Sequence, residues 1–170
     1  MAPDMALPPG FKAICAADPV ETAVTRAAHG ADPGTIVHGD TGGRCFLAVV
    51  LTPGFPVEDS AVRSLGANAL HDALAALAPV GLPIAIDVGQ ILVNGGMVAT
   101  LGVHRAPTAT AGVPDWLVLW IDVAIDLRAD DPGLDPMHTC LAEEGFAATA
   151  AEVMAGFDAW EDRPARRVAA

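Results

Sequence analysis

Lysine is nearly absent from the sequence, and positive charge is scarce throughout. One lysine, Lys12, and eight arginines stand against 21 acidic residues, which gives a formal net charge of -12 at pH 7. Such a charge repels phosphate backbones and anionic lipids, so we expect no nucleic acid and no membrane among the partners of this chain. Any chemistry that needs a lysine has a single candidate.

Paired cysteines and long apolar runs are missing as well. The three cysteines, Cys15, Cys45 and Cys140, are widely spaced without a CxxC motif, which argues against a disulfide framework or a zinc knuckle. The histidines form no HxH or HxxxH pair, so no metal site is predicted. The N-terminus lacks the features of a signal peptide, and no apolar run is long enough to span a membrane. We therefore expect a cytoplasmic protein with reduced thiols.

The composition that is present is that of a globular domain. Apolar residues make up 52% of the chain and charged residues 18%. A chain of 170 residues with this composition can bury a sizeable core in one domain. Proline and glycine in residues 1–17 indicate an N-terminal loop segment, and the polar residues 161–170 indicate a flexible tail. The domain itself is predicted to span residues 18–160.

Local signals predict three helices and six strands. Asp18 as N-cap, Pro19 in the first turn and Glu21 three residues after the cap predict a helix that ends at Gly30. Helices are also expected over residues 58–78 and at about residues 149–160. The predicted core stripe of the middle helix consists of Val62, Leu65, Ala69, Leu70, Leu74 and Leu77. Strands are predicted over residues 34–40, 42–54, 82–87, 90–95, 97–104 and 116–127.

Most of these strands follow one another without a helical crossover between them. Parallel neighbours need such a crossover, whereas antiparallel neighbours need only a short turn. The order therefore predicts an α+β domain with a mixed, largely antiparallel sheet and helices packed against it.

The order of segments also resembles a known superfamily. The stretch FLAVVLTPGFP, a long helix, then QILVNGGMVATLGV, DWLVLWIDVAI and HTCLAEEGF are similar to the biotin/lipoate–protein ligase superfamily, and in particular to its small single-domain ligase-like members. The resemblance covers roughly residues 18–160. It implies the catalytic-domain fold of these ligases, with a substrate cleft on one face of a mixed sheet. Enzymes of this superfamily activate biotin or a lipoyl-type acid with ATP and pass it to a lysine of a carrier domain, and a related branch transfers octanoyl groups.

When the motifs of the superfamily are compared with this sequence residue by residue, the order of segments is kept, but the positively charged residues of the motifs are missing. The Gly/Arg-rich loop that closes over the acyl-adenylate is shortened here to Gly42, Gly43 and Arg44. The KWPND segment falls on residues 86–90, where none of its residues is kept. In the DGRKVAG segment, Gly96 replaces the arginine and Met97 replaces the lysine.

At other positions some residues of the superfamily motifs are kept and others are changed. Asn94 and Gly95 form the expected turn, and Val98 is kept. Trp120 and Asp122 stand where the GIGIN-type strand would offer glycine for close approach to a ligand. The TSL…EG signature corresponds to Thr139-Cys140-Leu141 and to Glu144-Gly145.

These changes remove what adenylation needs. Negative charge that develops on a phosphate is stabilised by cationic donors, and methionine supplies neither charge nor an N–H group. Asp87 and Asp122 would repel a triphosphate instead. We therefore expect a catalytically degenerate protein, without a cofactor, that acts as a binding, assembly or accessory factor. Its partner would be a larger enzyme or carrier domain, or a small carboxylic acid, and a homodimer is a further option.

Two other readings stay open. The chain could be an acyltransferase or ligase that uses Arg44, Asp122 or Cys140 in a non-standard site, although the octanoyl-transfer branch has its cysteine before the TSL segment and this chain does not. It could also be a sensor of biotin-like acids. The candidate ligand-binding residues are Arg44, Asn94, Gly95, Gly96, Met97, Val98, His104, Trp120 and Asp122.

Several candidates also have a purely structural interpretation. Met97 can fill the core, Cys140 can be a small buried thiol, and His104 can be a solvated residue at a strand end. Trp116 and Trp120 are four residues apart, so in a strand they share a face and can pack beneath a helix.

Overall fold

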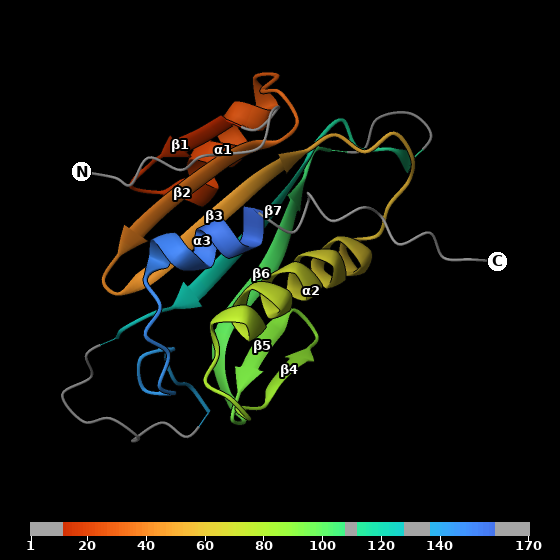
Figure 1. Ribbon diagram of the computed structural model, residues 1–170. Helices are drawn as coiled ribbons and strands as arrows, with labels where there is room; N and C mark the ends of the chain where they lie inside the picture. Colours follow the sequence, from red (N-terminus) through yellow and green to blue (C-terminus); the bar gives the residue numbers. More distant parts are fainter. Residues whose placement is uncertain (1–11, 108–111, 128–136, 159–170) are drawn as a thin grey trace.

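The described residues form one seven-stranded sheet with three helices (Figure 1). A computed structural model describes residues 12–107, 112–127 and 137–158. The strand order is β1-β2-β3-β7-β6-β5-β4, in which β1 is parallel to β2 and the other neighbouring pairs are antiparallel. The predicted α+β class is thus confirmed. The elements are β1 (Lys12–Cys15), α1 (Pro19–Ala28), β2 (Thr35–Thr41), β3 (Arg44–Leu51), α2 (Asp59–Leu77), β4 (Ile84–Asp87), β5 (Gln90–Val93), β6 (Gly96–Arg105), β7 (Leu117–Ala124) and α3 (Ala150–Asp158).

The helix α1 begins where its capping residues predicted. The Asp18 side chain accepts a hydrogen bond of 2.9 Å from the Glu21 backbone N–H, and Pro19 occupies the first turn, where its missing N–H costs nothing. The helix ends at Ala28 and is followed by Gly30 with a φ of 81°. These local signals are sufficient to place the helix without knowledge of the rest of the fold.

The prediction of a loop over residues 1–17 is wrong for β1. Lys12–Cys15 pairs in parallel with β2 and forms one edge of the sheet. Its side chains are mostly exposed, so they carry no alternating apolar pattern, and the strand depends on the free edge that β2 offers. Residues 1–11 lie outside the described residues, as do the predicted link over residues 128–136 and the tail over residues 161–170.

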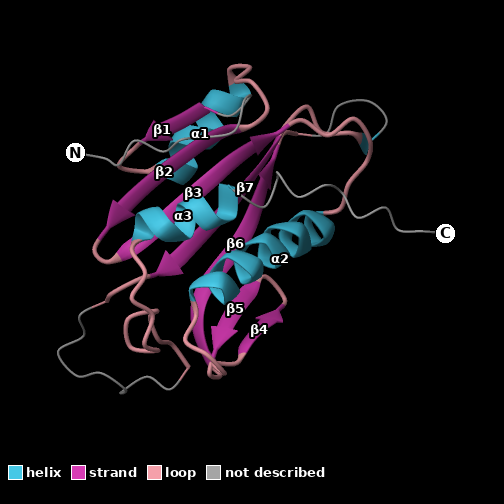
Figure 2. Cartoon of the chain, in the orientation of Figure 1, coloured by secondary structure: helices cyan, strands magenta, loops and turns pink. Residues whose placement is uncertain are grey.

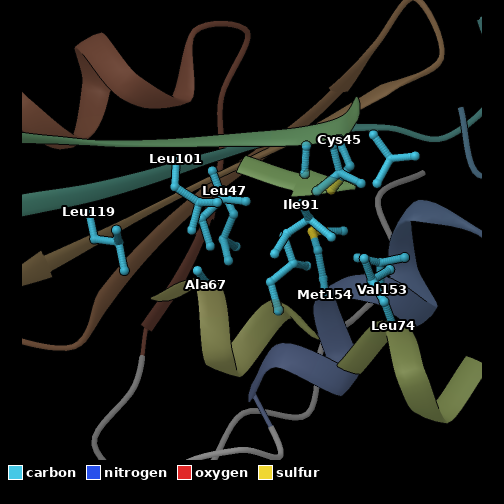
Figure 3. Packing of buried hydrophobic residues seen from close by; sticks show 14 of the residues in the cluster. Cys45, Leu47, Ala67, Leu74, Ile91, Leu101, Leu119, Val153 and Met154 are labelled. Carbon is cyan, nitrogen blue, oxygen red and sulfur yellow. The ribbon is translucent and has the colours of Figure 1, made fainter. Parts of the chain in front are cut away.

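The helices lie on both faces of the sheet. Helices α2 and α3 pack on one face, and α1 packs on the other face against β2, β3 and β7 (Figures 1 and 2). The main core lies beneath α2 and α3, where Leu47, Leu74, Ile91, Leu101 and Leu119 are among its buried members (Figure 3). Among the described residues, no helix is long and apolar enough to cross a membrane.

A glycine brings α2 close to the sheet. A Cβ on Gly66 would lie 2.7 Å from a methyl carbon of Leu119, so only glycine allows the helix to approach this closely without a shift. Of the predicted stripe, Val62, Ala69, Leu70 and Leu74 are buried and Leu77 is partly buried. Leu65 is 48% exposed, so its assignment to the core is wrong. The buried face of the helix instead includes the small residues Gly66, Ala67 and Ala73 beside Leu70 and Leu74.

The last helix begins one residue after its predicted start. Helix α3 runs from Ala150 to Asp158, and residues 159–160 of the expected span are not described. Thr149 precedes it, and its backbone N–H and hydroxyl donate hydrogen bonds of 2.8 and 2.9 Å to the Glu152 carboxylate. The Glu152 N–H donates in return to the Thr149 hydroxyl oxygen at 3.3 Å, which satisfies a donor that the first turn of a helix leaves without a partner.

His38 is the buried ionisable side chain of the strand β2. It is 6% exposed, and its Cα partners in the neighbouring strands are Cys15 and Leu47. Burial lowers the pKa of the His38 imidazole below its usual value of 6.5, because removal from water disfavours the charged form.

We predict that His38 makes the fold less stable in mild acid. As the pH falls through 6.5, the unfolded imidazole gains a proton that the folded one does not, so the unfolding free energy decreases until the lower folded pKa is reached. Urea unfolding at about pH 7.5 and about pH 5.5 measures this loss. His38→Gln should reduce the loss, whereas the exposed control His29→Gln should leave it unchanged. An equal loss in the wild type and His38→Gln would contradict the assignment.

Candidate functional site

Arg44 and Asp122 form a two-pronged ion pair between the neighbouring strands β3 and β7. The Arg44 Nε donates to Asp122 Oδ1 at 2.8 Å, and Nη2 donates to Oδ2 at 2.9 Å. The two side chains are 35% and 18% exposed, so the pair is only partly shielded from water. The sequence singled out both residues separately. The structure brings them together and directs the arginine at a carboxylate of its own chain.

Trp120 lies on the same face of β7 as Asp122. Its Cα partner on β6 is Gly102, and a Cβ built on that glycine would lie 2.2 Å from Cζ2 of the indole. The ring therefore extends across β6 directly above the glycine. Trp116 and Trp120 both pack against the cluster that contains Ala23 and Ala27 of α1. The two tryptophans therefore lie on the same face of the sheet, beneath the helix α1, as the packing interpretation predicted.

Gly102 is a residue that the sequence reasoning missed. A glycine inside a strand of otherwise larger residues often marks a close approach of another group, and this signal was available. Its partner was not, because the contact depends on the register between β6 and β7. Glycine at position 102 is what gives the Trp120 indole its place on the sheet.

The turn between β5 and β6 has the backbone that its sequence predicted. Asn94 and Gly95 have φ values of 52° and 88°, and positive φ at both central positions is the requirement of a type I′ hairpin turn. Gly96 is buried, and a Cβ there would lie 2.7 Å from Cγ2 of Thr139. Glycine at position 96 thus makes room for the side chain of Thr139.

Met97 contacts the same segment through its backbone. Its N–H donates to the Met137 carbonyl at 3.0 Å, and its carbonyl accepts from the Thr139 N–H at 3.1 Å. The chain then crosses to the end of β7, where the Leu141 N–H donates to the Ala124 carbonyl at 3.0 Å. Residues 137–142 therefore link the start of β6 to the end of β7.

The remaining candidates are dispersed. Val98 is 1% exposed and belongs to the core beneath α2 and α3, so its side chain is not on the surface that carries Trp120. His104 is exposed and pairs with Val118, whereas Arg44 pairs with Ala124 at the opposite end of β7. Cys140 is 1% exposed, in agreement with the interpretation as a buried thiol.

The cysteines differ in what they could do. Burial, together with the nearby charges of Asp40 and Asp122, raises the pKa of the Cys45 thiol to about 12, so it stays protonated and unreactive at neutral pH. Cys15 is exposed on the edge strand β1. In the part of the chain that the structure describes, no group of three or more metal-ligating side chains gathers in one place.

The β2–β3 turn is fixed to the end of β7. Gly42 and Gly43 have φ values of 60° and 75°, and the Gly43 carbonyl accepts hydrogen bonds from Ile125 N–H at 2.9 Å and Asp126 N–H at 3.0 Å. A Cβ on Gly43 would lie 1.8 Å from the Asp126 carbonyl oxygen. A shallow depression beside this turn is lined by both glycines and by Asp40 and Asp126, among other residues.

Each cationic side chain on the described strands is paired with an aspartate. Lys12 contacts Asp32 at 2.6 Å, and Arg44 contacts Asp122. Arg105, at the end of β6, contacts Asp59 and donates to the Val57 carbonyl at 3.0 Å. It thereby holds the start of α2.

Comparisons with known proteins identify the family of this chain and proteins with a similar fold. The family model described as "Biotin/lipoate A/B protein ligase family" matches residues 7–169. A search among curated proteins gives no significant match. The fold is similar to that of a biotin protein ligase-like protein of unknown function from Silicibacter sp., with a TM-score of 0.81 and 26% identity over 92% of this chain and 70% of that chain.

Two enzymes share the fold at lower identity. The apo biotin protein ligase from Aquifex aeolicus matches with a TM-score of 0.68 and 18% identity over 89% of this chain and 68% of that chain. The biotin acetyl coenzyme A carboxylase synthetase from Helicobacter pylori, with bound biotinylated ATP, matches with a TM-score of 0.57 and 10% identity over 86% and 69%. At these identities the matches establish a common fold.

The two glycines of the β2–β3 turn form a matched pair for mutagenesis. We predict that Gly42→Ala costs about 1–2 kcal/mol, because it forces a side chain into positive φ with open space around it. Gly43→Ala should cost clearly more, because it adds a collision with the Asp126 backbone. Chemical unfolding of both variants measures the difference. Equal losses would show that the turn is not held against β7 as described.

Proposed function

The chain belongs to the biotin/lipoate A/B protein ligase family, and we propose that it is a catalytically degenerate member that acts as a binding, assembly or accessory factor for a protein partner. The observation that carries this proposal is the pairing of every cation on the described strands, Lys12, Arg44 and Arg105, with an aspartate. A cation that is already neutralised by a neighbouring carboxylate attracts a phosphate weakly. The sheet therefore offers little to hold a nucleotide.

The positions that lost their cations have become structural. Gly96 and Met97, which stand for the arginine and lysine of the ligase pattern, hold Thr139 and its neighbours by close packing and backbone hydrogen bonds. The shortened Gly/Arg loop is a tight turn bonded to Asp126, so it lacks the length and the freedom to close over a bound acyl-adenylate. Both features support a scaffold that is retained for binding.

The acyltransferase alternative finds less support. A cysteine nucleophile has to be accessible and able to ionise, but Cys140 is buried and the pKa of Cys45 is raised to about 12. Cys15 is exposed, but β2 lies between its strand and the strand of Arg44. The exposed thiol of Cys15 is therefore remote from Arg44, the cation that this alternative would use.

The edge strand β4 is the surface that favours a protein partner. Within the part of the chain that the structure describes, no strand pairs with its outer side, and Ile86 within it is 41% exposed. Val80 and Val88, in the turns before and after the strand, are more exposed still. An exposed strand edge with apolar side chains can accept a strand from another chain.

We predict that the purified protein releases no pyrophosphate from ATP in the presence of biotin, lipoate or octanoate. The physical reason is that each lysine or arginine on the described strands is already paired with an aspartate, so the sheet offers no free cation to stabilise charge on the α-phosphate. A coupled pyrophosphate assay, with an active biotin protein ligase as the positive control, measures this. Release of pyrophosphate that depends on the added acid would refute the loss of catalysis.

We further predict that Ile86→Lys combined with Val88→Lys removes the polypeptides that co-purify with the protein. Lysine on an edge strand opposes strand addition by charge and by the cost of its desolvation. Phe55→Lys is the matched control, because Phe55 is 67% exposed in the loop between β3 and α2. Light scattering after gel filtration distinguishes a foreign partner from a homodimer. Unchanged co-purification in the β4 variant would place the interface elsewhere.

A further inference from the structure

We propose that the thiol of Cys15 is a site of reversible oxidation by hydrogen peroxide, with the buried imidazole of His38 as its base. The two residues are Cα partners on the parallel strands β1 and β2, which lie side by side at one edge of the sheet (Figure 1). Of the three cysteines, Cys15 is exposed, whereas Cys45 and Cys140 are buried. Neither Cys15 nor His38 belongs to the candidate functional site, so this chemistry is separate from the proposed function.

The thiol and the imidazole lie on the same face of the sheet. The preceding pair in the register, Ile14 and Val37, packs in the cluster beneath α1. Because side chains alternate along a strand, Cys15 and His38 point to the opposite face. Neighbouring strands are about 4.8 Å apart, so rotation of the cysteine side chain about χ1 can bring its sulfur to the ring.

The end of β1 is held beside His38 by its backbone. The Ala16 N–H donates to the His38 carbonyl at 2.9 Å, and a Cβ on Gly39 would lie 2.5 Å from the Ala16 carbonyl oxygen. The chain then enters α1 at the Asp18 cap. These contacts fix the backbone of Cys15 relative to that of His38, so only side chains have to move for the thiol to meet the ring.

His38 is a buried polar side chain without a partner. It is 6% exposed, and within the described part of the chain its ring forms no hydrogen bond or ion pair. Nearly all buried polar groups are hydrogen-bonded, so an exception needs an explanation such as a catalytic or redox role. Burial lowers the pKa of the imidazole, so the ring is neutral at neutral pH and has one nitrogen able to accept a proton. The thiol of Cys15 is the proton donor that the register places beside it.

The reaction transfers one oxygen atom to sulfur. The thiol proton of Cys15 moves to a ring nitrogen of His38 while the sulfur attacks one oxygen of hydrogen peroxide. The O–O bond breaks, and the leaving hydroxide takes the proton from His38, so the products are a sulfenic acid and water. An external thiol then condenses with the sulfenic acid to a mixed disulfide with loss of water, and a second thiol reduces that disulfide and restores Cys15.

Charge and burial favour a small uncharged oxidant. The net charge of -12 repels anionic oxidants such as oxidised glutathione. Lys12, on the same strand, is paired with Asp32 and so attracts an anion weakly. Asp40, two residues after His38 on the same face of β2, adds a further negative charge. Hydrogen peroxide carries no charge and is small enough to reach a thiol beside a buried ring.

The oxidised thiol has no cysteine within reach in its own chain. Cys45 is on β3, and β2 lies between its strand and β1, so the two Cα atoms are roughly 9–10 Å apart or more. A disulfide needs Cα atoms within about 7 Å of each other. Cys140 follows β7, which is further from β1 in the strand order. The expected products are therefore a sulfenic acid or a mixed disulfide, not an internal disulfide.

The test measures the rate at which Cys15 is oxidised near neutral pH. The full-length protein is treated with hydrogen peroxide in the presence of dimedone, which traps sulfenic acids, and peptide mass spectrometry locates the adduct. Cys15→Ser removes the site and His38→Gln removes the base. His29→Gln is the matched control, because His29 is exposed at the end of α1 and bonded to the Thr25 carbonyl. N-acetylcysteine gives the rate of a thiol without neighbours.

We expect the wild type and His29→Gln to form the adduct on Cys15 at least about tenfold faster than N-acetylcysteine, and His38→Gln to lose about this factor. Cys15→Ser should form no adduct. Between about pH 7 and about pH 8.5 the rate of His38→Gln should rise steeply as the thiol ionises, whereas the wild-type rate should rise only weakly. A purely structural role of His38 would leave this pH dependence unchanged.

Two results would overturn this assignment. One is a wild-type Cys15 that reacts no faster than N-acetylcysteine. The other is a His38→Gln variant that is folded by circular dichroism and keeps the rate and the pH dependence of the wild type. If His38→Gln does not fold, the wild-type protein decides alone, because a rate that rises steeply with pH would show that no base acts on the thiol.

Discussion

Strand β7 is hydrogen-bonded on both sides, to β3 and to β6, and its two faces determine what the rest of the sheet can do. Leu117, Leu119, Ile121 and Val123 point into the core beneath α2 and α3. The residues between them point to the other face, where they meet α1, Gly102 and Arg44. Because side chains alternate strictly along a strand, a slip of one residue would exchange the core with the candidate site. Burial of the apolar face determines the register of β7 against β3, and this register places Asp122 within reach of Arg44.

The sequence was sufficient where the determining signals are local. The helix α1 follows from Asp18 and Pro19, and the turn of β5 and β6 follows from Asn94 and Gly95. The fold class followed from the order of strands. Local signals failed for β1, which is held by the edge of β2, and for Leu65, whose helix approaches the sheet through Gly66. In both cases tertiary contacts decide what the local pattern leaves open.

The sequence predicted individual residues of the candidate site but not how they are arranged. Arg44 and Asp122 were each singled out, yet their ion pair joins residues 78 positions apart and needs the pairing of β3 with β7. The contact between Gly96 and Thr139 needs the chain after β7 to return to the start of β6. The absence of a side chain at position 96 therefore has a structural consequence that depends on the whole fold. The family establishes the fold, whereas an activity has to be argued from the residues of the site.

The pairing of β3 with β7 also determines when the centre of the sheet can form during translation. The hairpin of β2 and β3 leaves the ribosome well before β7, since 78 residues separate Arg44 from its partner Asp122. At a translation rate of about 5–20 residues per second, this interval lasts roughly 4–16 seconds. During that time the inner edge of β3, with its run of aliphatic side chains, has no strand beside it. An unpaired strand edge of this kind is open to pairing with other chains until β7 emerges and completes the centre of the sheet.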